Sequence, residues 1–246
     1  MAEIAPTLND VLESIDAGRV LEVGCGDGEF TEILIENLGA FDSIYAVDVE
    51  ESSLDEARSY FAKAHPGASV TFRNADATKL PLSTASFDTG AISNSLHHMA
   101  QPEAALGELV RVLRPGGRLI INEMIADVED PRQQVGRDLH HLKARVDRTK
   151  GIGHNRTLTR AVIDSLLDSL KLQHVERHEY DRVDIDTSDV DLEGRLDHID
   201  GYIEHAAWSS DYASIRREAT RLKQRIRTVG FDAPPQRLII AQKPAE

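Results

Sequence analysis

The first half of the chain alternates short apolar runs with longer amphipathic stretches, and this alternation is the strongest constraint on its fold. The runs predict strands over 19–23, 43–48, 69–73, 87–93 and 118–123, and the stretches predict helices over 4–16, 28–38, 51–64 and 102–113. Strands that alternate with helices of this length form βαβ units and a parallel sheet. Ligands of such sheets bind at the carboxyl ends of the strands, so we expect the functional site there.

The second half follows another pattern. It predicts helices over 127–150 and 159–170 and strands over 172–185 and 236–243. Residues 189–229 are charged and predicted to be mostly helical, and they are too many for a simple connection. We expect this insertion to form a cap or the contact surface of a homodimer. The length suits a single domain over 1–246, with a regular half over 1–125 and a second half over 126–246.

Composition disfavours several classes of partner. The net charge of −14 disfavours nucleic acid and anionic membranes, and no apolar run approaches the roughly 20 residues of a membrane-spanning helix. The first residues lack the basic start and apolar core of a secretory signal. Cys25 is the single cysteine, which is typical of a reducing compartment. A cytoplasmic protein without membrane insertion is expected.

The most informative segment is VLEVGCGDGEF, residues 20–30. A predicted strand enters a turn with Gly24, Gly26 and Gly28, where the backbone can bend sharply and a ligand can lie against it. The dinucleotide pattern G-x-G-x-x-G does not fit, because its third glycine would fall on Glu29 or Thr31. Two other acidic residues, Glu22 and Asp27, flank the turn; they would repel a diphosphate and attract a ligand that carries an ammonium and a sulfonium.

Two further carboxylates follow predicted strands. Asp48 ends the second strand, where a carboxylate can accept hydrogen bonds from both hydroxyls of a ribose. The alternative is an N-cap of the helix over 51–64, and nicotinamide-binding folds share the ribose carboxylate. Asp76 follows the third strand and could accept a hydrogen bond from an adenine amino group; its alternative is an ordinary turn residue.

Five segments in order resemble the class I S-adenosylmethionine-dependent methyltransferases, close to the type 11 group of small-molecule enzymes. The segments are VLEVGCGDG at 20–28, YAVDVE at 45–50, RNADATKLP at 73–81, SFDTGAISNSLHHM at 86–99 and RVLRPGGRLII at 111–121. The resemblance covers about residues 15–125, the cofactor-binding half. It implies a Rossmann-like α/β fold with helices on both faces of a seven-stranded sheet, in the order 3-2-1-4-5-7-6 with strand seven antiparallel.

The resemblance also implies roles by position, with S-adenosyl-L-methionine as the cofactor. Gly24, Cys25, Gly26 and Gly28 would approach its methionine part, with Glu22 near the ammonium. Asp48 would hold the ribose, Val49 would pack on the adenine, and Asp76 and Ala77 would meet the adenine edge. Asn94 would line the cofactor and face the acceptor.

Transfer of a methyl group needs a general base only if the acceptor must lose a proton. His97 and His98 are the candidate catalytic bases, because histidine titrates near neutrality; the alternative is that they pack under the site. His140 and His141 are candidates for contact with the substrate. Adjacent histidines on a helix point in different directions, and with His154 they form no known zinc spacing, so no metal is expected.

The sequence thus predicts an S-adenosylmethionine-dependent methyltransferase that acts on a small molecule. Two alternatives stay open, a catalytically inactive sensor or scaffold that binds the same cofactor, and a nicotinamide-dependent oxidoreductase. The acidic composition disfavours a nucleic-acid substrate.

Overall fold

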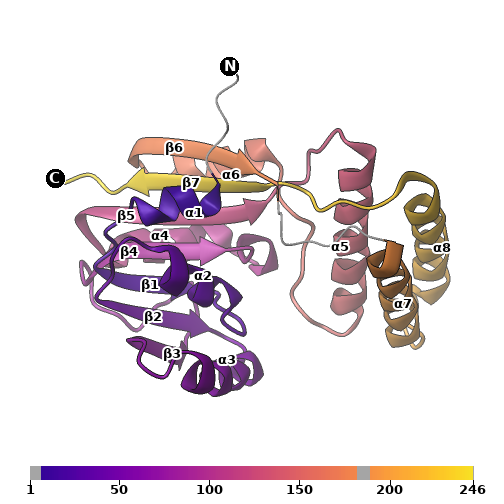
Figure 1. The fold of residues 1–246 in the computed structure, drawn as a ribbon, viewed down its shortest axis with the longest axis horizontal. Helices are drawn as coiled ribbons and strands as arrows, with labels where there is room; N and C mark the ends of the chain where they lie inside the picture. Colours follow the sequence, from indigo (N-terminus) through magenta and orange to yellow (C-terminus); the bar gives the residue numbers. More distant parts are fainter. Residues whose placement is uncertain (1–6, 182–188, 246) are drawn as a thin grey trace.

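The computed structural model describes residues 7–181 and 189–245, which form an α/β sandwich with a helical cap (Figure 1). The strands are β1 (Arg19–Val23), β2 (Ser43–Asp48), β3 (Val70–Asn74), β4 (Phe87–Ser93), β5 (Leu113–Met124), β6 (Gln173–Tyr180) and β7 (Gln236–Gln242). The helices are α1 (Leu8–Glu13), α2 (Glu29–Asn37), α3 (Glu51–Ala64), α4 (Pro102–Val112), α5 (Pro131–Thr149), α6 (Arg160–Asp168), α7 (Asp189–His205) and α8 (Tyr212–Val229), with a 3₁₀ turn, η1 (Leu96–His98).

The sheet has the order β3-β2-β1-β4-β5-β7-β6, as expected from the resemblance. Strands β1 to β5 pair in parallel, and β7 pairs antiparallel with both β5 and β6. The order reverses between β1 and β4, which places a crevice at the carboxyl ends of these two strands.

Side chains on the two faces of the sheet form separate apolar cores. Along β1 they alternate, so that Leu21 and Val23 join one core and Val20 joins the other. The core around Leu21 is covered by α4 and α6, and the core around Val20 is covered by α1, α2 and α3. The same alternation points the Glu22 side chain toward α2, so that this side chain is buried between the sheet and the helix.

One strand boundary differs markedly from the expected one. Strand β5 begins at Leu113 rather than 118, because Leu113 already pairs with Phe87 before a bulge separates this pair from Thr89 and Arg118. The predicted insertion is two helices, α7 and α8. Parts of the predicted helix over 4–16 and strand over 172–185 fall on residues 1–6 and 182–188, which lie outside the described residues.

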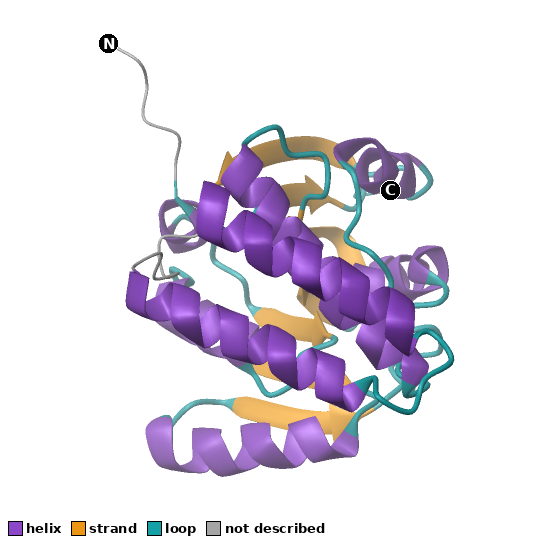
Figure 2. Cartoon of the chain, turned by 90° about the vertical axis from the view of Figure 1, so that its right-hand side faces the viewer, coloured by secondary structure: helices purple, strands orange, loops and turns teal. Residues whose placement is uncertain are grey.

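Helices α5, α7 and α8 form the cap, which has an apolar core of its own. Leu142, Leu196, Ile215 and Leu222 belong to this core. The cap stands beyond the carboxyl ends of the parallel strands, and its helices cross in front of the sheet when viewed from that side (Figures 1 and 2). Across the described ranges, none of the helices combines the length and the apolar character needed to cross a membrane.

Candidate functional site

A cleft of about 1300 Å³ lies at the carboxyl ends of the strands, where the topology places a site. Most of its wall is built from six short segments of the first half and of the loop after α5, and α2 adds Glu29, Glu32 and Glu36. These segments are residues 23–27, 47–50, 75–78, 93–95, 98–101 and 151–153. The volume exceeds that of typical small-molecule sites, so the cleft can hold a nucleoside-sized cofactor together with an acceptor.

The glycine turn is shaped by the backbone rather than by side chains. Gly24 has φ +71°, and a Cβ there would lie 2.5 Å from Oγ of Ser95, which donates a hydrogen bond to the Gly24 carbonyl. Gly26 has φ +53° and no atom within 4 Å of the Cβ position, so its backbone faces open space in the cleft. Gly28 caps α2 and packs on α3, and it does not line the cleft.

Asp48 ties the second strand to this turn. Its Oδ2 accepts a hydrogen bond of 2.8 Å from the amide of Gly26, and its Oδ1 accepts one of 2.9 Å from the amide of Glu50. The N-cap of α3 is Glu50, so Asp48 does not hold the capping position that was its alternative interpretation. The next residue, Val49, is 66% exposed on the wall of the cleft, where an apolar side chain can pack on a flat ring.

Asp76 and Ala77 lie on the same wall. Oδ1 of Asp76 accepts hydrogen bonds from the backbone amide and the hydroxyl of Thr78, at 2.8 and 2.7 Å. These bonds hold the pKa of Asp76 below its ordinary value. Asp76 is therefore a turn residue, and the turn places its ionised carboxylate at the cleft.

Glu22 lies beneath the glycine turn and not on the wall of the cleft. It is 1% exposed, and its Oε2 accepts a hydrogen bond of 2.5 Å from Oγ1 of Thr31 on α2. Burial raises the pKa of Glu22 to about 7, against the opposing effect of the Thr31 hydrogen bond. The carboxylates that face the cleft beside the turn are those of Asp27 and Asp48.

Asn94 and Cys25 also line the cleft. Asn94 adopts the left-handed conformation with φ +45°, which asparagine tolerates better than most residues, and its Oδ1 accepts a hydrogen bond of 3.0 Å from the amide of Met124. Cys25 is 5% exposed, and burial raises the pKa of its thiol. A neutral, buried thiol is not a nucleophile, so Cys25 serves the turn by its small size.

Of the two candidate bases, His98 lines the cleft and His97 does not. Nδ1 of His98 donates to the carbonyl of Gly153 at 3.3 Å. Loss of water around the ring, followed by the effect of His97 and His154, lowers the pKa of His98 to about 4. His97 is 1% exposed, and its Nδ1 lies 3.1 Å from Oε2 of Glu123.

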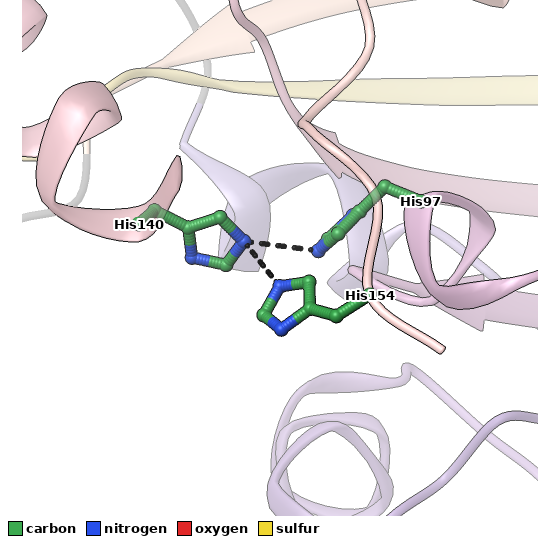
Figure 3. Close-up of side chains that lie close together, drawn as sticks. All are labelled: His97, His140 and His154. Carbon is green, nitrogen blue, oxygen red and sulfur yellow. Dashed lines mark hydrogen bonds between the residues drawn. The ribbon is translucent and has the colours of Figure 1, made fainter. Parts of the chain in front are cut away.

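The adjacent histidines of α5 point in different directions, as expected, and neither lines the cleft. Nε2 of His140 lies 3.2 Å from Nε2 of His97 and 3.0 Å from Nε2 of His154 (Figure 3). Burial, followed by the neighbouring histidines, lowers the pKa of His140 to about 2. Nε2 of His141 instead lies 2.9 Å from the hydroxyl of Thr157.

Glu123, which belongs to none of the motifs recognised in the sequence, organises this end of the sheet. Its side chain is fully buried at the end of β5, and Oε1 accepts hydrogen bonds from the amides of Ser95 and Leu96 at 2.9 and 2.7 Å. Glu123 therefore positions the turn that carries His97 and His98. A carboxylate that ends the apolar run RLIINE was the available signal, by analogy with Asp48.

Residues 21–121 match the sequence profile of the family described as "Methyltransferase domain". This segment carries the glycine turn, Asp48, Asp76, Asn94 and His98, so the match and the wall of the cleft coincide. Over residues 21–121 the chain is thus similar to methyltransferase domains. The cap and the last two strands lie outside the matched methyltransferase segment.

The curated relatives of the methyltransferase segment are named for methyl transfer to different atoms, oxygen or carbon. The O-methyltransferase cnsE of Penicillium expansum is 36% identical over 118 residues, which are 48% of this chain and 42% of that protein. The ubiquinone/menaquinone biosynthesis C-methyltransferase UbiE of Pseudomonas fluorescens is 34% identical over 113 residues, 46% of this chain and 44% of that protein. The chain thus matches less than half the length of these two relatives.

The fold of the whole chain has a solved counterpart in the YcgJ protein from Bacillus subtilis. The two structures superpose with a TM-score of 0.64 over 96% of each chain, at 20% sequence identity. The similarity extends beyond the methyltransferase segment to the seven-stranded sheet as a whole, and it concerns the fold alone.

Proposed function

We propose that the chain is an S-adenosylmethionine-dependent methyltransferase that acts on a small hydroxylated molecule. The observation that carries the proposal is the open backbone of Gly26, whose amide is bound by Asp48 at the edge of the cleft. Beside it, the exposed Val49 offers an apolar surface to an adenine ring. A bare glycine backbone next to an exposed apolar surface suits an amino acid joined to an adenosine.

Charge favours the sulfonium cofactor over a dinucleotide. Asp27 and Asp48 face the cleft beside the turn, and Glu29 and Glu32 of α2 line its rim. Carboxylates grouped here repel a diphosphate and attract a ligand with an ammonium and a sulfonium, because opposite charges at short range attract strongly where water is partly excluded. This supports the methyl donor and disfavours a nicotinamide cofactor.

S-adenosylmethionine would supply a methyl group already activated on sulfur. The chain's task is then to align the acceptor and to exclude water, which contributes several kcal/mol of barrier lowering in enzymes of this kind. Asn94 is held at the end of β4 by its bond to Met124, so its position on the wall is fixed. The loop over 151–153 forms the part of the wall next to His98, which donates a hydrogen bond to Gly153.

His98 is our proposed proton acceptor. Its Nδ1 proton is donated to Gly153, which leaves Nε2 unprotonated in the neutral ring. With its pKa lowered to about 4, His98 is a weak base. A weak base is sufficient for an acceptor hydroxyl, because the hydroxyl becomes strongly acidic as its oxygen forms the bond to the methyl group. The O-methyltransferase name of one relative supports such an acceptor, and the C-methyltransferase name of another supports carbon as the alternative.

Two measurements test the proposal. Calorimetric titration with S-adenosylmethionine and with NAD, side by side, is expected to show micromolar binding of the methyl donor and none of NAD. Incubation with tritiated methyl donor and pools of small hydroxylated metabolites is expected to yield labelled product. Binding of NAD alone would overturn the cofactor assignment. Binding of the methyl donor without transfer to any pool would favour the inactive sensor or scaffold.

A further inference from the structure

Three imidazoles converge at the junction between the sheet and the cap. His97 comes from η1 after β4, His140 from the middle of α5, and His154 from the loop between α5 and α6. One ligand nitrogen of each lies within 4.8 Å of the other two, and the rings point their Nε2 atoms toward a common centre (Figure 3). His97 and His154 are each 1% exposed.

Buried carboxylates fix the protons of two of these rings. Oε1 of Glu123 is occupied by two backbone amides, and Oε2 faces Nδ1 of His97 at 3.1 Å. Oδ2 of Asp147 accepts from Nζ of Lys143 at 2.6 Å and faces Nδ1 of His154 at 2.7 Å. Nδ1 of His97 and of His154 therefore carries the proton, and each Nε2 presents a lone pair.

Three neutral imidazole rings cannot form hydrogen bonds between all the Nε2 atoms that meet at this centre. Nε2 of His140 faces both lone pairs, at 3.2 and 3.0 Å, but it can carry only one proton. If Nε2 of His140 carries its proton, that proton can be donated fully to only one of the two neighbouring Nε2 atoms. If it does not, neither neighbour receives a hydrogen bond. A cation at the centre removes the conflict, because it accepts all three lone pairs.

We infer that His97, His140 and His154 form a binding site for a divalent transition metal of the zinc class. Three neutral imidazoles are ligands that zinc prefers, and a tetrahedral ion with Zn–N bonds of about 2.05 Å separates its ligand nitrogens by about 3.3 Å. The Nε2 of His140 lies 3.2 Å from that of His97 and 3.0 Å from that of His154, and both separations are close to this value. Carboxylates behind two of the rings are the usual outer partners that orient histidine ligands.

Such an ion would join the cap to the sheet beside the cleft. The neighbouring His98 stacks with His154 at 4.0 Å between ring centroids and donates to Gly153, and both His98 and Gly153 line the cleft. The amide of Asn155 also donates to the carbonyl of His97 at 2.9 Å. The ion would therefore hold the loop after α5 in the position that closes the cleft.

The test uses full-length protein without a polyhistidine tag, stripped with a chelator and titrated with zinc chloride by calorimetry. Cobalt(II) added to the same protein reports coordination through its visible absorption. The variants are His140→Ala and Glu123→Gln, and His141→Ala is the matched control, because His141 is adjacent on the same helix but faces Thr157. Thermal unfolding with and without zinc gives an independent readout for each protein.

Wild type and His141→Ala are expected to bind one equivalent of zinc, to give the intense bands of tetrahedral cobalt, and to unfold at a higher temperature with zinc. His140→Ala should bind zinc more than about 100-fold more weakly and lose the thermal shift. Glu123→Gln keeps the ligands and should weaken binding by about 10- to 100-fold. The inference is overturned if wild type binds neither ion at micromolar concentration, or if His140→Ala binds like His141→Ala. Titration of wild type decides the matter even if a variant fails to fold.

Discussion

Glu22 makes the stability of the chain depend on pH in a direction that the structure predicts. Its carboxyl group is 1% exposed under the glycine turn, and burial raises its pKa from 4.5 to about 7. In the unfolded chain the group ionises near pH 4.5, whereas in the folded chain it keeps its proton until about pH 7. Folding therefore loses stability as the pH rises through this interval, and the loss is complete above the folded pKa.

The magnitude follows from the two pKa values. A shift of one unit corresponds to about 1.4 kcal/mol, so the full shift is worth about 3 kcal/mol, and most of it appears between pH 5 and pH 8. Glu22→Gln keeps an oxygen for the Thr31 hydroxyl but has no charge to bury. Relative to wild type, the variant should therefore gain about 2–3 kcal/mol of unfolding free energy between pH 5 and pH 8.

The assay is urea unfolding of cofactor-free wild type and Glu22→Gln at pH 5, 6, 7 and 8, followed by circular dichroism. Glu36→Gln is the control, since it removes a glutamate from the exposed side of α2, and it should follow the wild-type curve. Parallel curves for wild type and Glu22→Gln across this range would refute the reasoning. They would mean that Glu22 ionises in the folded chain as it does in the unfolded one.

Three further substitutions test the backbone and the cleft. Gly24→Ala should destabilise the fold by about 2–4 kcal/mol in urea unfolding, because the new Cβ would overlap Ser95 and the residue would keep a left-handed conformation. Gly107→Ala, on the exposed side of α4 with open space around it, should stabilise the fold by about 0.5–1 kcal/mol. Asp48→Asn keeps an acceptor oxygen for Gly26 but loses the charge, and it should weaken S-adenosylmethionine binding about 10- to 100-fold in calorimetry.

Each of these three predictions would be contradicted by a specific result. A Gly24→Ala protein as stable as wild type would mean that the turn tolerates a side chain, and a destabilised Gly107→Ala protein would place that helix face in a contact. Unchanged affinity in Asp48→Asn, with an unchanged unfolding curve, would remove this carboxylate from the cofactor site.

The sheet could be predicted because its determinants are local. Apolar runs of five or six residues, such as those at 19–23 and 43–48, form strands between amphipathic helices, and glycines after the first run require a turn. Strand order and the antiparallel β7 came from resemblance to a family and were confirmed. The boundary of β5 was missed because a pairing between Leu113 and Phe87, distant in sequence, sets it.

Part of the candidate site could likewise be predicted from the sequence, and part depended on the tertiary structure. Gly26, Asp48, Val49, Asp76 and Asn94, which the sequence suggests as cofactor-binding residues, lie on the wall of the cleft. Their positions follow from the ends of strands, which the sequence marks. Glu22 lies one residue from the end of its strand, and the alternation of β1 turns it into the core instead, where Thr31 of α2 meets it.

By itself, the sequence determined the parallel sheet, the glycine turn and the carboxylates at the strand ends, because neighbouring residues specify those features. Only the tertiary structure decided which histidines meet. His97 and His140 are 43 residues apart, and His140 and His154 are 14 apart in a spacing that matches no zinc motif. Their convergence depends on how the cap packs against the sheet, and such packing between distant segments leaves no periodic signal along the chain.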